Sequence, residues 1–138
     1  MDAGLLLIGV LAEGLPKMDH VGVPPAPAAM AEAPAPLLVL PPDDSSDLNV
    51  MLWSTDGFPV MANGSSSVVT PARQELRDLM RAFPSAPSVA RLRELGIRSV
   101  VVVRDRVTGG PYEAALHASI DGLGVTRRTV GADLLYTI

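Results

Sequence analysis

The chain has no cysteine, and this absence excludes disulfides, thiolate metal ligands and cysteine nucleophiles together. Aromatic residues are also scarce, at 4% of the 138 residues, so the core has to be built from Val, Leu, Ala and Met. The formal net charge is -4, and the basic residues are scattered along the chain instead of forming a stripe. We therefore expect no nucleic-acid partner, and we expect one domain from a chain of this length.

No hydrophobic run reaches the roughly 20 residues that a helix needs to cross a bilayer. The segment Leu5–Leu15 comes nearest, and it allows three interpretations. A signal peptide would begin with positive charge, which Asp2 does not supply. A buried helix of a soluble protein fits the helical spacing of its apolar residues. We favour the third, the end of a truncated transmembrane span that leaves the bilayer at Glu13, Pro16 and Lys17, and we assign residues 1–15 to it.

Residues 16–36 are rich in Pro and Ala. Because proline fixes φ and removes a backbone donor, we expect an extended, semi-rigid linker here. A soluble domain then follows over residues 37–138.

The sequence of the first half of this domain predicts two strands and two helices. Leu37–Leu40 is a short apolar run closed by two prolines, and 49–54 reads as a second strand after a polar turn. Thr70 and Pro71 together predict a helix N-terminus, with the apolar face continuing to Phe83. A second helix begins near Pro87, turns three apolar residues inward and ends at Gly96; these three are Val89, Leu92 and Leu95.

The second half predicts the centre and the end of the sheet. Residues 97–103 form the most β-branched run and predict the central strand. A loop over 104–110, a third helix over 112–123 and strands over 125–130 and 134–138 follow. This order indicates an α/β fold whose small mixed sheet contains a right-handed parallel βαβ unit and a C-terminal antiparallel hairpin.

Two loops are candidates for ligand binding. The small residues from Gly64 to Ser67 could bring backbone N–H groups together on a phosphate, but no lysine follows and a plain surface loop is favoured. The segment from Arg104 to Gly110 follows the predicted central strand, where open α/β sheets bind ligands, but a solvated loop with a local ion pair is favoured. The ligand-binding candidates are Trp53, Asn63, Gly64, Ser65 and Arg104.

Other chemistry-bearing residues have simpler interpretations. The acidic group Asp43, Asp44 and Asp47 lacks the glycine and the distal glutamate of an EF-hand, so a solvated turn is favoured over a calcium loop. Trp53 has apolar neighbours, which favours a core position over a surface ring that stacks on a sugar.

The histidines and serines do not define a catalytic or metal site. His20 and His117 have no partner at metal-ligand spacing, and we expect no metal or other cofactor. A hydrolase triad of Ser65, His117 and Asp121 can be named, but Ser65 is not in a nucleophile elbow. We therefore assign no catalytic residue to this chain.

Several segments, taken in order, resemble a known family. They are Leu37–Pro41, Met51–Thr55, Gly57–Val60, Asn63–Ser66, Pro71, Phe83–Pro84, Leu92–Val102 and Asp133–Ile138. This series is similar to the C-terminal extracytoplasmic region of actinobacterial multispanning membrane glycosyltransferase-like proteins of the GT-C type, from about Leu37 to the C-terminus.

The resemblance implies where the domain is located and that the catalytic residue lies outside this chain. The last membrane helix of that family precedes a Pro-rich exit, which is why Leu5–Leu15 is interpreted as part of a span. A polyprenyl-phosphate sugar donor is used there with the help of an acidic residue in the first extracytoplasmic loop, outside this chain. We therefore expect a non-catalytic domain on the extracytoplasmic side of the cytoplasmic membrane, shaping a donor or acceptor entrance. The alternative is a free-standing soluble module whose two candidate loops form a small-ligand cleft.

Overall fold

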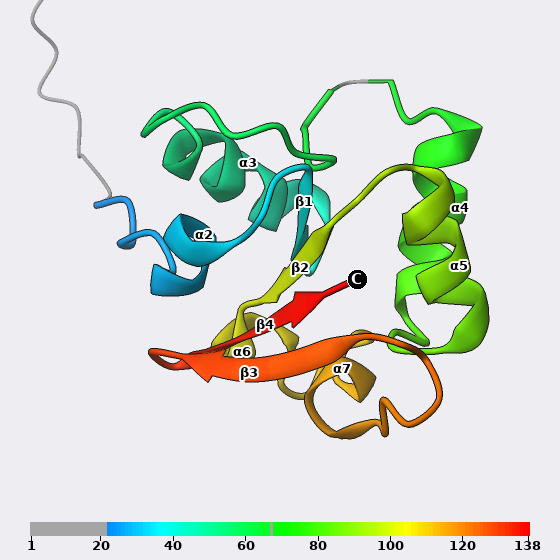
Figure 1. The fold of residues 1–138 in the computed structure, drawn as a ribbon. Helices are drawn as coiled ribbons and strands as arrows, with labels where there is room; N and C mark the ends of the chain where they lie inside the picture. Colours follow the sequence, from blue (N-terminus) through cyan, green and yellow to red (C-terminus); the bar gives the residue numbers. More distant parts are fainter. Residues whose placement is uncertain (1–21, 67) are drawn as a thin grey trace, which may run out of the picture.

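Four short strands form one mixed sheet in the computed structural model, which describes residues 22–66 and 68–138 (Figure 1). The strands are β1 (Leu37–Leu40), β2 (Ser99–Val102), β3 (Thr126–Val130) and β4 (Asp133–Thr137). Their order is β1-β2-β4-β3, with β1 parallel to β2 and the other neighbours antiparallel. The predicted mixed α/β sheet with a parallel pair and a C-terminal hairpin is confirmed, and the β-branched run supplies an inner strand.

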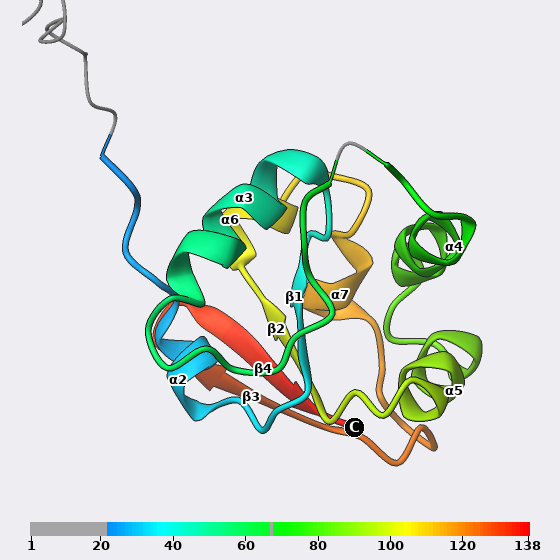
Figure 2. The same cartoon turned by 90° about the horizontal axis from the view of Figure 1, so that it is seen from above.

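Helices cover both faces of this sheet. They are α2 (Ala28–Glu32), α3 (Asp44–Trp53), α4 (Pro71–Met80), α5 (Ala86–Glu94), α6 (Arg104–Val107) and α7 (Ala114–His117). In Figure 2, α2 and α3 lie on one side of the strands and α4, α5 and α7 on the other.

Strand side chains alternate between two cores, as the period of two requires. Leu38, Leu40, Val100 and Val102 face α4, α5 and α7, where they pack with Phe83 and other buried residues. The alternate positions Leu37, Val39, Val101 and Leu135 face α2 and α3. The central strands are therefore buried on both faces, which explains why their sequences are continuously apolar.

The two edges of the sheet are treated differently. The edge of β1 is covered by residues 60–62, since the Leu37 N–H donates to the Val60 carbonyl and the Ala62 N–H donates to the Leu37 carbonyl. The opposite edge strand, β3, is exposed over its first four residues and carries Arg127 and Arg128 there. Charged side chains on an edge strand discourage pairing with another strand.

The predicted helix signals around α4 and α5 are confirmed. The Thr70 hydroxyl accepts a hydrogen bond from the Arg73 N–H at 3.3 Å, and Pro71 is the first helical residue. Gly96 follows α5 with φ of 71°, a conformation that glycine adopts without strain. Leu95, in contrast, was expected to point inward and is 45% exposed.

The predicted strand over 49–54 is wrong, because this segment belongs to α3. The Asp43 carboxylate caps the helix by accepting the Ser46 N–H at 2.8 Å. The helix buries Ser46 and Asp47 while Leu48, Met51 and Leu52 are exposed. Val50 and Trp53 are buried beside these polar residues, so apolar side chains stand on both faces of the helix and form no single stripe that a sequence pattern could reveal.

The Pro/Ala-rich stretch also differs from the expected extended linker. Ala28–Glu32 forms α2, whose Ala29 and Met30 are buried in the core that faces α3. Alanine favours helix enough to form one turn between the flanking prolines. On either side, the Pro24 carbonyl accepts from Trp53 Nε1 at 2.7 Å and the Pro34 carbonyl accepts from the Ser99 hydroxyl at 2.6 Å. The stretch is thus attached to the domain from Pro24 onward.

The segment after β2 forms shorter helices than expected. The predicted loop over 104–110 contains α6, and the predicted helix over 112–123 is reduced to α7. The helix α7 ends at Ala118, where the backbone becomes extended. Gly122 and Gly124 take positive φ in the turns that follow. The predicted hydrophobic helix over residues 1–15 lies outside the described residues. Within the described ranges, no helix has the length and apolar character to cross a bilayer.

We predict that Tyr136→Phe destabilises the fold. The fully buried Tyr136 hydroxyl donates to the Ala115 carbonyl at 2.6 Å and accepts from Arg127 Nη1 at 3.2 Å, so its loss leaves a buried carbonyl unpaired. The expected decrease in the free energy of unfolding is about 1–2 kcal/mol, measured by urea titration. Tyr112→Phe is the control, since the described residues give the Tyr112 hydroxyl no hydrogen bond; equal effects of the two variants would contradict the prediction.

Candidate functional site

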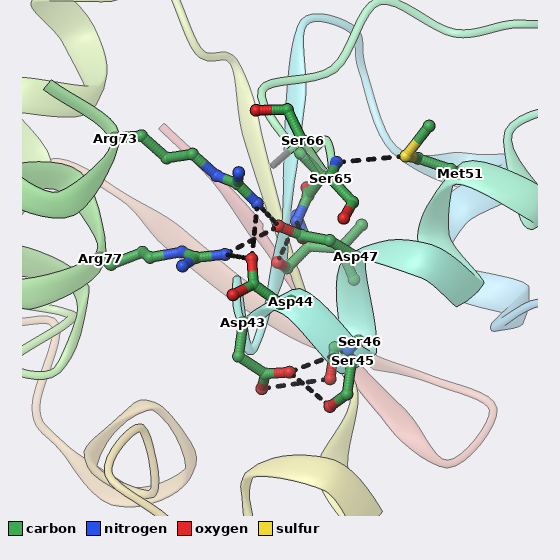
Figure 3. Close-up of polar contacts among 12 residues, drawn as sticks. Asp43, Asp44, Ser45, Ser46, Asp47, Met51, Ser65, Ser66, Arg73 and Arg77 are labelled. Atoms are coloured by element: carbon green, nitrogen blue, oxygen red, sulfur yellow. Dashed lines mark hydrogen bonds and ion pairs between the residues drawn. The ribbon is translucent and has the colours of Figure 1, made fainter. Parts of the chain in front are cut away.

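The most concentrated charges in the described residues lie where the start of α3 faces α4. Figure 3 shows Arg73 and Arg77 reaching from α4 toward Asp44 and Asp47. Arg73 Nη2 lies 3.2 Å from Asp44 Oδ1 and 2.8 Å from Asp47 Oδ2. Arg77 Nη2 lies 2.7 Å and 3.4 Å from the same two oxygens. We call these four residues the Asp–Arg cluster.

Helical spacing explains why each pair points the same way. Asp44 and Asp47 are three residues apart on α3, and Arg73 and Arg77 are four apart on α4, so each pair shares one face of its helix. Like charges at these spacings repel within a helix, and here each pair is neutralised by the other.

Asn63 connects the Asp–Arg cluster to the sheet. Its side-chain amide accepts the Val39 N–H at 2.6 Å and donates to the Val39 carbonyl at 2.9 Å, as a neighbouring strand would. The same Nδ2 donates to Asp47 Oδ1 at 2.8 Å. One amide thus joins β1 to the buried carboxylate of α3.

Burial differs sharply between the two acids. The Asp47 side chain is 2% exposed and that of Asp44 is 63% exposed, while the arginines are 20% and 12% exposed. A buried carboxylate is tolerated only when its oxygens are paired, and both Asp47 oxygens have partners. The predicted solvated turn is therefore wrong for Asp47, and Asp43 serves as the N-cap of α3.

Hydrogen bonding to Arg77, strengthened by the charges of both arginines, lowers the pKa of Asp44 despite an opposing effect of desolvation. The same contact raises the pKa of Arg77. The cluster holds two positive and two negative charges, so its formal charge is zero. It binds segments of the protein to one another and leaves no excess charge with which to attract an anion.

A groove of about 600 Å³ borders the cluster. Its lining is mainly apolar, with Val60, Val68, Leu76, Leu95 and Ile97 among its walls and Arg73 and Arg91 among its polar groups. Volumes of this order are typical of small-molecule sites. Arg73 is engaged with the acids and Arg91 with Glu94 at 3.0 Å, so the groove is suited to an apolar group.

Two of the three candidate residues of the Asn-Gly-Ser loop line this groove, and Asn63 does not. Gly64 and Ser65 line it, and the Ser65 N–H contacts the Met51 sulfur at 3.2 Å. Neither Asn63 nor Gly64 takes a positive φ, and a Cβ added at Gly64 would meet no atom within 4 Å. Glycine is therefore not required at this position by the backbone or by close packing.

Trp53 and Arg104 lie at a different place. The predicted core position of Trp53 is confirmed, since it is 8% exposed, its N–H is bound by Pro24, and Arg106 lies 5.1 Å from its ring centroid. Arg104 donates its backbone N–H to Asp133 and its Nε to the Ala132 carbonyl. A second hollow of about 380 Å³ is lined here by Trp53 and Arg106, without residues 63–66. The two candidate loops thus line separate hollows.

The residues of the possible triad are not joined by hydrogen bonds in the described part of the chain. The Asp121 carboxylate accepts from Ser119, at 2.7 Å, and neither Ser65 nor His117 bonds to it. No group of three potential metal-ligating side chains gathers within residues 22–66 and 68–138.

Sequence reasoning missed Arg73 and Arg77. The only signal was the spacing, since Arg73 and Arg77 are four residues apart and Asp44 and Asp47 three apart, and this spacing does not show that the two pairs meet because solvated arginines need no acidic partner. The comparisons with known proteins add no further residues, since no family model, curated protein or solved structure matches the chain.

We predict that Asp47→Ala lowers the free energy of unfolding by about 3 kcal/mol, because it leaves Arg73, Arg77 and Asn63 without their buried acceptor. Asp78→Ala is the matched control. Asp78 pairs with Arg81 at 3.4 Å with both side chains more than half exposed, so its loss should cost less than about 1 kcal/mol. Urea titration compares the two, and similar losses would show that burial at Asp47 is unimportant.

We also predict that acid weakens the cluster. The folded-state pKa of Asp44 is lowered, so its contribution to stability is present above the unfolded value, about 3.9, and is lost as the pH falls through the folded pKa. The free energy of unfolding, measured by urea titration from pH 6 down to about pH 3, should therefore fall less steeply with acid in Asp44→Asn than in the parent protein. Because Asp44 is largely exposed, the difference should shrink in high salt; an unchanged acid dependence would contradict the assignment.

Proposed function

We propose that this chain is the non-catalytic extracytoplasmic C-terminal domain of a membrane glycosyltransferase-like protein that depends on polyprenyl-phosphate sugars. The observation that carries the proposal is the ordered series of segments from Leu37 to the C-terminus that resembles this region of the family. In this proposal the hydrophobic segment Leu5–Leu15 attaches the domain to the cytoplasmic membrane.

The structural positions of those segments support the proposal. The Asn63 side chain forms hydrogen bonds with both the N–H and the carbonyl of Val39 in β1. The buried Phe83 packs edge-on against Tyr136, with ring centroids 4.9 Å apart. Leu92 is fully buried, and Gly96 turns the chain from α5 toward β2. Asn63, Phe83, Leu92 and Gly96, four of the residues behind the resemblance, therefore join elements of a single framework.

A supporting role agrees with the chemistry of the described residues. Their Asp–Arg cluster is internally neutralised, and the groove that borders it is mainly apolar. Such a domain contributes shape and apolar surface to an entrance through which a lipid-linked donor or an acceptor reaches a catalytic centre in the membrane. The sugar transfer itself belongs to the membrane-embedded part of the proposed parent protein.

A free-standing small-ligand-binding module is the second candidate. The groove beside Gly64 and Ser65 favours it, because its volume lies in the range of small-molecule sites and its walls are apolar. A cleft shared by both candidate loops would need residues 104–110 to line the same groove, and none of them does.

The test combines membrane binding with an activity assay on the full chain. We expect it to float with vesicles of phosphatidylethanolamine and phosphatidylglycerol and to transfer no sugar from a polyprenyl-phosphate donor. Leu7→Asp should weaken flotation, since a charged residue in a membrane helix costs about 3 kcal/mol, or roughly 100-fold in partitioning. Leu95→Asp, on the surface of the domain, is the control. Sugar transfer by this chain, or a chain that stays entirely free of vesicles, would refute the proposal.

A further inference from the structure

Three apolar side chains of α3 point to solvent, while Val50 and Trp53 of the same helix are buried. Leu48, Met51 and Leu52 are 57%, 43% and 51% exposed, whereas Asp47 on the inner side is 1% exposed. A surface helix normally turns its apolar stripe to the core and its polar stripe to water. This helix does the reverse at these positions.

These three residues share one face, because they stand at i, i+3 and i+4. Phe58 follows the end of the helix, where its N–H donates to the Ser54 carbonyl at 2.9 Å, and it is 77% exposed. Its φ of 44° is unfavourable for a bulky residue, so the local turn holds an aromatic ring outward at some cost. We call Leu48, Met51, Leu52 and Phe58 the α3 apolar face.

The Asp–Arg cluster prevents α3 from rotating to bury these residues. Turning the helix would remove Asp47 from Arg73, Arg77 and Asn63 and expose Val50 and Trp53. The outward leucines are therefore a fixed property of the domain.

The C-terminal end of α3 lies beside the point where the chain enters the domain. Trp53, the last residue of α3, donates its indole N–H to the Pro24 carbonyl at 2.7 Å. Figures 1 and 2 both show the blue entry segment running past the same end of α3. Leu15, the end of the hydrophobic segment, precedes Pro24 by nine residues, which span at most about 30 Å.

The sequence that carries most of this face favours hydrocarbon over a charged partner. Residues 48–55 contain no charged side chain, and Asp56 is the first to follow. Exposed Leu and Phe side chains are among those that bury themselves at a membrane interface. In the proposed attachment, a tether at Leu5–Leu15 keeps the face close to the bilayer, so even a small apolar contact is occupied because its effective concentration is high.

We propose that the α3 apolar face docks on the lipid bilayer surface and fixes the orientation of the domain on the membrane. This inference rests on the proposed membrane attachment and extends it with a second, structured contact. The binding is apolar, so salt should leave it largely unchanged.

The absence of cysteine permits a direct test on the full chain. Leu48→Cys and Leu52→Cys carry an environment-sensitive fluorophore, with Ala90→Cys as the control, since Ala90 is an exposed residue of α5 that does not line the groove. Vesicles of phosphatidylethanolamine and phosphatidylglycerol contain nitroxide-labelled lipid as the quencher. We expect quenching of about twofold or more at positions 48 and 52, and little at position 90, in both low and high salt.

The outcomes separate the two proposals. If the chain floats with the vesicles but positions 48 and 52 are quenched no more than position 90, the docking inference is wrong and the membrane attachment stands. If the chain does not associate with vesicles, both fail. A fluorophore at position 52 that is already shielded without vesicles and does not respond to quencher lipid would show that another part of the chain covers this face, which would also overturn the inference.

Discussion

The Asp47 carboxylate is the contact on which the arrangement of the other parts depends. It is almost fully buried, and Asn63, Arg73 and Arg77 supply its hydrogen bonds. These partners come from the loop beside β1 and from α4, so one acid connects both faces of the sheet. An unpaired buried carboxylate is far more costly than a missing surface ion pair, and the contact therefore tolerates little displacement of any partner.

That requirement also explains the unusual orientation of α3. The helix must turn Asp47 inward, and the leucines on the opposite side are then exposed regardless of their own preference for burial. The buried contacts of Asp47 in this way determine that apolar residues of α3 are exposed on the surface of the domain. The groove beside Gly64 and Ser65 shares the same origin, because Arg73 helps to line it while remaining bound to the acids.

Local signals in the sequence predicted much of the fold. Continuous apolar runs indicated β1 and β2, and Thr70 with Pro71 indicated the start of α4. The failures occurred where a distant partner decides the conformation. Asp43 and Asp47 read as a solvated turn because nothing local shows that Arg73 and Arg77 neutralise the second acid, and the Ala-rich α2 is stabilised by packing against β4.

The candidate site was less predictable than the fold. Asn63 was singled out as part of a ligand loop, whereas its amide bonds to Val39 and Asp47, a role that requires knowing the position of β1. Trp53 was correctly placed in the core, although the apolar neighbours that suggested it, Met51 and Leu52, are themselves exposed. Gly64 and Ser65 line a groove whose opposite wall comes from α4 and α5, and no local pattern joins these segments.

The side-chain amide of Asn63 has one more consequence. With residues 60–62 it occupies the hydrogen-bonding positions along β1, while two arginines stand on β3 at the other border of the sheet. Neither border offers a free, uncharged row of amides to a foreign strand. Many copies crowded together can therefore resist amyloid-like polymerisation even though the central strands are among the most aggregation-prone sequences in the chain.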